Sequence, residues 1–201
     1  NDHLFSIIQS NDEGFLIAGY SYSPVSGEKT SANYGPANTA DLWVIKTNNV
    51  GAIEWDKTLG GTTNENKFGN ISQTSDNGFF IASTSYSQAT GDKTENNLGQ
   101  ENNWVVKLDP LGNVQWDKTI FTSGRDDIGF AFLLNDGSIV AANHTNGEIA
   151  GYKTQSTYDI SKKYCDFWIV KLSNVVPPVA DFMHADEPVC SRTCIDFTNL
   201  S

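Results

Sequence analysis

Short runs of β-branched and aromatic residues recur along the chain, separated by polar clusters rich in Asn, Asp, Gly and Ser. In the first sixty residues these runs cover Leu4–Ser10, Phe15–Tyr22, Leu42–Thr47 and Ala52–Leu59. Such runs bounded by turn residues are typical of β-strands. Because no segment shows a sustained 3.6-residue apolar period, the pattern predicts four strands here and almost no helix in the chain.

Four sequence blocks recur in the same order with a period of roughly 60 to 64 residues. They are an Asp-containing turn, a Gly-x-Lys-Thr block, a Trp-[Val/Ile]-[Val/Ile]-Lys block and a Trp-Asp-Lys-Thr block. The recurring positions are the turn aspartates Asp12, Asp76 and Asp136, the tryptophans Trp43, Trp104 and Trp168, the lysines Lys46, Lys107 and Lys171, and the tryptophans Trp55 and Trp116. A period of this length marks a solenoid, a propeller or another repeat array.

Four strands per repeat predict an all-β fold made of β-propeller blades, each a sheet of four antiparallel strands. Residues 1–174 would hold about three blades, with boundaries near 1–61, 62–122 and 123–174. The third strand of each repeat is apolar on both faces, as expected for a sheet between two neighbouring sheets. A β-solenoid is the competing architecture, but its coils are much shorter than this repeat.

The repeating pattern of the third unit runs from Asp126 to Leu172, and no Trp-Asp-Lys-Thr block follows it. Since propellers usually have four to eight blades, we expect the chain to be an internal piece of a longer protein. Residues 175–178 are predicted to be a linker. The segment Val179–Ser201 is similar to the first strands of a PKD domain, an immunoglobulin-like sandwich. Within it, Cys190 and Cys194 are spaced for a small local disulfide, although unpaired, half-buried cysteines are equally compatible with the sequence.

Composition narrows the function classes. The chain has 201 residues, 11% of them aromatic, which excludes a disordered tail. With 13 Lys and Arg against 24 Asp and Glu, the net charge of -11 argues against nucleic acid as a partner. No run of 18 apolar residues occurs, so no membrane span is expected in this segment.

The recurring polar residues allow either chemistry or a structural role. The three turn aspartates are candidates for calcium binding or acid chemistry, but such residues commonly accept backbone N–H bonds in tight turns. Because a lysine follows each Trp at one fixed offset, we expect the three lysines to pair with carboxylates of their own or an adjacent repeat. Trp55 and Trp116 suit either sugar stacking or the core, and their recurrence favours the core.

No catalytic or metal-binding motif is found in the chain. We therefore expect no catalytic residue, no cofactor-binding residue and no bound metal, with calcium as the alternative. The three long polar loops, 23–40, 87–103 and 146–166, vary while the strands repeat. Two interpretations stay open for these loops: a binding surface, or ordinary solvated connections.

The repeats resemble those of β-propeller proteins secreted by Bacteroidota, most clearly in their Trp-[Val/Ile]-[Val/Ile]-Lys and Trp-Asp-Lys-Thr blocks. The resemblance covers residues 1 to about 172 and implies an extracellular or cell-surface protein exported by type IX secretion. It implies a non-catalytic role in adhesion, in binding a carbohydrate or protein ligand, or as a structural spacer, where other domains of the assembly are also partners. The alternative is part of a secreted carbohydrate-active enzyme whose catalytic residues lie outside this segment.

Overall fold

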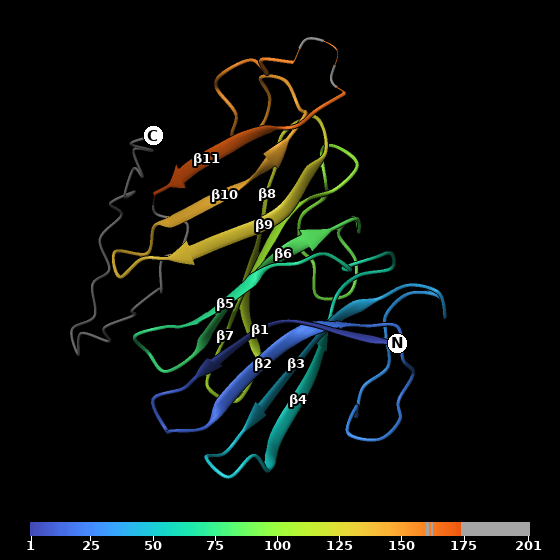
Figure 1. The fold of residues 1–201 in the computed structure, drawn as a ribbon, viewed down its shortest axis with the longest axis vertical. Coiled ribbons are helices and arrows are strands. Elements are labelled where there is room, and N and C mark those ends of the chain that lie inside the picture. Colours follow the sequence, from blue (N-terminus) through green and yellow to red (C-terminus); the bar gives the residue numbers. More distant parts are fainter. Residues whose placement is uncertain (160, 162, 174–201) are drawn as a thin grey trace, which may run out of the picture.

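The chain is all-β in a computed structural model, with its strands in three antiparallel sheets (Figure 1). The structure describes residues 1–159, 161 and 163–173, and these contain no helix. The predicted linker at 175–178, the PKD-like segment at 179–201 and the candidate Cys190–Cys194 disulfide lie outside the described residues. Of the three cysteines, only Cys165 is described, as an exposed free thiol.

Each repeat forms one sheet whose strands pair in chain order. The first sheet contains β1 (Asp2–Gln9), β2 (Phe15–Ser21), β3 (Asp41–Thr47) and β4 (Ile53–Leu59). The second sheet contains β5 (Asn70–Gln73), β6 (Phe79–Ser85), β7 (Asn102–Leu108) and β8 (Val114–Ile120). The third sheet contains β9 (Asp126–Leu133), β10 (Ile139–Thr145) and β11 (Asp166–Leu172), and no fourth strand among the described residues. The four strands predicted for the first repeat are confirmed, with bounds shifted by at most two residues.

The sheets stack face to face and bury two apolar cores between them. Leu16 and Val44 of the first sheet pack against Phe79 and Trp104 of the second. The other face of the second sheet, which carries Phe80, packs against the third sheet. Burying side chains of this size contributes about 1.5–3 kcal/mol each. The second sheet is therefore covered on both faces, which explains why every residue of β6 and β7 is buried.

The first strands of the three sheets, β1, β5 and β9, lie beside one another, and the sheets follow each other along the long axis of the molecule (Figure 1). The long loops of all three repeats leave the same end of the sheets, because each joins the second strand of a sheet to the third. We call this the loop end. The Asp12-type turns and the turns between third and fourth strands lie at the opposite end, the turn end. The described residues do not form a closed ring of sheets.

Among the described residues, each end of the stack leaves one sheet face uncovered. On the third sheet, Phe130, Phe132, Phe167 and Ile169 lie on one face and are all exposed. In the first two sheets, Val44 and Val105 occupy the position of Ile169 and are fully buried under the next sheet. The exposed face of the third sheet is thus the face that covers a neighbour elsewhere in the stack.

Candidate functional site

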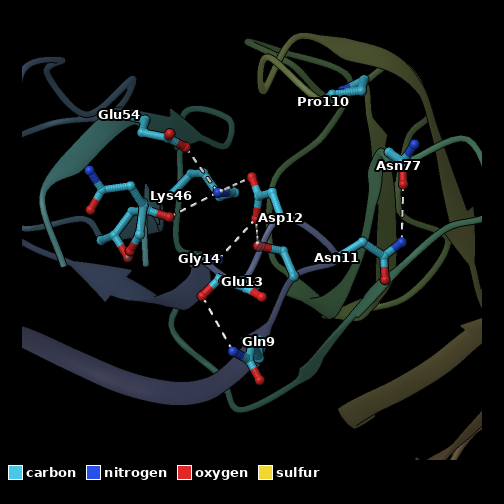
Figure 2. Close-up of polar contacts among 12 residues, drawn as sticks. Gln9, Asn11, Asp12, Glu13, Gly14, Lys46, Glu54, Asn77 and Pro110 are labelled. Carbon is cyan, nitrogen blue, oxygen red and sulfur yellow. Dashed lines mark hydrogen bonds and ion pairs between the residues drawn. The ribbon is translucent and has the colours of Figure 1, made fainter. Parts of the chain in front are cut away.

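The turn aspartate of the first repeat, Asp12, is bound to Lys46 near the end of β3 (Figure 2). Lys46 Nζ lies 2.7 Å from Asp12 Oδ2 and 2.9 Å from Glu54 Oε2, and it also donates to the Thr47 carbonyl oxygen at 2.8 Å. Asp12 Oδ1 in turn accepts a hydrogen bond from the backbone N–H of Gly14. The ammonium is almost fully buried and satisfied by three oxygens, so the turn aspartate fastens the turn to the third strand.

The other two repeats form the same contact with different strength. Lys107 Nζ lies 2.8 Å from Asp76, whereas Lys171 Nζ lies 3.8 Å from Asp136. The side chain of Lys107 is 6% exposed and that of Lys171 is 53% exposed. Both sequence predictions are confirmed: the aspartates accept backbone N–H bonds in their turns, and each lysine pairs with a carboxylate of its own repeat.

These contacts lower the pKa of the aspartates. Hydrogen bonds from Lys46 and then Ser10 lower the pKa of Asp12 to about 2. For Asp76, burial opposes ionisation, but the bonds from Lys107 and Thr74 outweigh it and lower the pKa to about 2. The stabilisation is complete above the unfolded value near 3.8 and is lost as the pH falls towards 2.

Replacing Lys107 with methionine is expected to lower the free energy of unfolding by about 1–2 kcal/mol at pH 7, because the Leu108 carbonyl oxygen and Asp76 lose a nearly buried donor. Lys171→Met is the matched control and should cost less than about 0.5 kcal/mol, since its ion pair is exposed. Urea unfolding at pH 7 and pH 3 measures both. Equal losses in the two variants would contradict the structural role of the buried lysine.

A second recurring cluster fixes the outer edge of the first two sheets, and we call it the outer clamp. Asp117 on β8 accepts hydrogen bonds from Trp104 Nε1 at 2.8 Å, from the Thr94 backbone N–H at 3.0 Å and from Thr94 Oγ1 at 2.6 Å. In the first repeat Asp56 accepts the same three bonds from Trp43 and Thr30. The outer clamp joins three sequence blocks, namely Gly-x-Lys-Thr, Trp-x-x-Lys and Trp-Asp-Lys-Thr.

The lysine of each Gly-x-Lys-Thr block is buried, which sequence reasoning missed. The glycine of the block adopts positive φ, at 58° for Gly27 and 63° for Gly91, so the chain turns sharply and carries the lysine inward. Lys29 donates to Thr58 Oγ1 at 2.8 Å, and Lys93 donates to Thr119 Oγ1. Burial lowers the pKa of Lys93 to about 8. Recurrence of a lysine at one place in the block was the available sign that it has internal partners.

The two Trp-Asp-Lys-Thr tryptophans lie between sheets. Trp55 is half-buried, packs edge-on against Phe79 and donates from Nε1 to the Pro110 carbonyl oxygen at 3.3 Å. Trp116 is also half-buried and packs against Phe80. Both lie at the margin of the two cores, as their recurrence indicated, although neither is fully buried.

At the loop end the two junctions between sheets use different polar pairs at equivalent positions. In the second junction, Asn102 Nδ2 donates to Asp126 Oδ2 at 2.6 Å. In the first junction these positions carry two acids, Asp41 and Glu65, both fully buried. Burial and the neighbouring Glu65 raise the pKa of Asp41 to about 8, against the opposing bond from the Tyr34 backbone N–H. Below about pH 8, Asp41 is therefore protonated, at the position where the second repeat has the side-chain amide of Asn102.

The second junction also contains a charged cluster that has no counterpart in the first. Arg125 forms ion pairs with Glu101 and, at 2.5 Å, with Asp127. Lys67 Nζ lies 3.4 Å from Asp127 Oδ1. Glu101 is 1% exposed, and every carboxylate of the cluster has a cationic partner. This pairing favours a structural role in joining the second and third sheets.

The long loops differ in how much aromatic surface they present. Tyr34 reaches the loop of the next repeat, where its hydroxyl donates to Asp92 Oδ1 at 3.1 Å. Tyr152 packs against Phe121. Tyr158 and Tyr164 of the third loop are 92% and 65% exposed. Of these four loop tyrosines, Tyr158 and Tyr164 are the most available to a ligand.

The comparisons with known proteins add no assignment. No protein-family model matches the chain, and no curated protein matches it significantly. Within the described residues, no group of three or more His, Cys, Asp or Glu side chains is placed to hold a metal ion. The same part of the chain contains no helix long and apolar enough to cross a membrane.

Proposed function

We propose that residues 1–174 are blades of a β-propeller and that the chain is a non-catalytic, extracellular binding or spacer module of a larger bacterial surface protein. The proposal includes a Bacteroidota-type secreted protein, exported by type IX secretion, with a PKD-like domain after the blades. Two four-stranded sheets and one three-stranded sheet, which pack on one another in one repeated arrangement, support the propeller architecture. The recurring Trp-[Val/Ile]-[Val/Ile]-Lys and Trp-Asp-Lys-Thr blocks support the relationship to the propeller proteins of Bacteroidota.

The observation that carries a binding function is the exposure of two tyrosines on the third long loop. In the first two repeats, the turn aspartates, the strand lysines and the tryptophans of the outer clamp have internal partners, which supports a scaffold role for them. Tyr158 and Tyr164 project from the third loop at the loop end. Tyr158 takes the place of Tyr34 of the first loop, because each donates its backbone N–H to the equivalent aspartate, Asp166 or Asp41. Exposed tyrosines offer a flat apolar ring and a hydroxyl, which suits a carbohydrate or protein ligand.

A double variant, Tyr158→Ala with Tyr164→Ala, is expected to weaken ligand binding at least about tenfold, a typical loss for two interface aromatics. The ligand is first identified by screening the chain on glycan and protein arrays with and without calcium. Val50→Ala is the control, because Val50 is 82% exposed at the turn end. Unchanged binding in the double variant, or an equal loss in the control, would contradict the loop-end assignment.

The alternative, part of a carbohydrate-active enzyme, is favoured by one observation only, the non-repeated cluster around Arg125 and Asp127. Its test is release of reducing sugars from a polysaccharide panel by the chain, compared with Asp127→Asn. Sugar release that the variant abolishes would replace the binding module by the enzyme. We expect neither protein to release reducing sugars, because the carboxylates of Glu101 and Asp127 are both held in ion pairs with Arg125.

A further inference from the structure

The outer edge of β11 carries an incomplete outer clamp. In the first two sheets, β4 and β8 cover the corresponding edge of the third strand. Among the described residues no strand pairs with the outer edge of β11, and Trp168 Nε1 has no hydrogen-bond acceptor. Lys153, Thr154 and Trp168 line a cavity of about 190 Å³ at this edge. These are the three positions that donate to the Trp-Asp-Lys-Thr block elsewhere.

The complete sheets define what this edge would accept. In the second sheet, Thr119 lies opposite Trp104 and Asp117 lies opposite Val106. Thr119 Oγ1 accepts from Lys93, and Asp117 accepts from Trp104 and Thr94. In the third sheet, Lys153, Thr154, Trp168 and Val170 take the places of Lys93, Thr94, Trp104 and Val106. An added strand would therefore place a threonine opposite Trp168 and an aspartate opposite Val170.

We propose that the outer edge of β11 is a binding site for an extended peptide segment of the Trp-Asp-x-Thr type, which adds antiparallel to β11 as a fourth strand. Main-chain hydrogen bonds to the sheet edge supply affinity, and side-chain contacts supply specificity. The aspartate accepts from Trp168 Nε1 and Thr154, and the threonine hydroxyl accepts from Lys153 Nζ, which at present donates to the Gly147 carbonyl oxygen at 2.7 Å. Tyr158 also lines this cavity, whereas Tyr164 does not, so the site adjoins one of the two tyrosines at the loop end.

The test uses the full 201-residue chain, ¹⁵N-labelled, and an unlabelled peptide carrying residues 112–121 of the same sequence. Five indole N–H resonances are observable, and Trp168→Phe assigns the one that belongs to Trp168. We expect saturable movement of that resonance on titration. A peptide with alanine in place of Asp117 should bind on the order of tenfold more weakly, because a charged acceptor is lost.

Thr154→Val and Thr94→Val form a matched pair of variants. Thr154→Val should weaken peptide binding on the order of tenfold, whereas Thr94→Val should leave it unchanged, because Thr94 already binds Asp117 of its own sheet. No movement of the Trp168 resonance, equal affinity of the two peptides, or an equal effect of the two threonine variants would overturn the proposal. Self-association of the chain through β11 that excludes the peptide would do the same.

Discussion

Asp117→Ala is expected to lower the free energy of unfolding by about 2–4 kcal/mol, the largest loss foreseen for any single polar side chain of this protein. The substitution removes one carboxylate that accepts three hydrogen bonds, from Trp104 Nε1 and from the backbone and hydroxyl of Thr94. Trp104 is fully buried, so its indole N–H would lose its partner without gaining water. Urea unfolding followed by tryptophan fluorescence measures the loss.

Two controls separate the outer clamp from general damage to β8. Asp56→Ala removes the same three bonds in the first sheet, where Trp43 is half-buried, and should cost only about 1–2 kcal/mol. A double-mutant cycle with Trp104→Phe should give a coupling energy of about 1 kcal/mol or more between Asp117 and the indole N–H. A coupling energy near zero would show that the carboxylate stabilises the sheet by another route.

Asp41→Asn is expected to stabilise the protein by about 1–3 kcal/mol at pH 8 and to have little effect at pH 5. The folded state keeps a proton on Asp41 up to about pH 8, whereas the unfolded carboxyl releases it near 3.8. Stability therefore falls as the pH rises through this window. An asparagine side chain does not ionise in this pH range, and its amide can donate a hydrogen bond to Glu65, as Asn102 donates to Asp126.

The reverse exchange, Asn102→Asp, provides the mirror experiment. It places a second carboxyl beside Asp126, whose pKa burial already raises. This variant should be less stable than the parent chain, and its stability should fall more steeply between pH 5 and pH 8. Urea unfolding at four pH values tests both variants. Stability curves that run parallel to that of the parent chain would show that the Asp41 proton does not control the first junction.

The repeat was enough to predict the strands of the first repeat, their antiparallel arrangement and the pairing of each strand lysine with a carboxylate. These features follow from local chemistry: β-formers between turn residues, and a cation at one fixed offset on the third strand. The outer clamp was also encoded in recurring blocks. It was missed because no pairing rule connects Thr94 with Asp117, and only the folded loop brings the two together.

Differences between the junctions were harder to foresee. Asp41 and Asn102 look like an unremarkable exchange between polar residues just before two tryptophan blocks. Their meaning depends on Glu65 and Asp126, which reach them from the connection to the next sheet. Likewise, Glu101 and Arg125 lie in segments that appear only as polar loop, and their pairing depends on how two sheets stack. Contacts between repeats therefore cannot be predicted from the sequence of a single repeat.

The two terminal faces of the stack of described sheets differ from each other. One end presents Trp43 and Ile45, the other Phe167 and Ile169, and the two faces are of the kinds that meet inside the molecule. Adding one more repeat would bury one such face and create another that is the same. The packing between neighbouring sheets therefore does not determine how many sheets the stack contains. The number of sheets must be set by whatever covers the terminal faces.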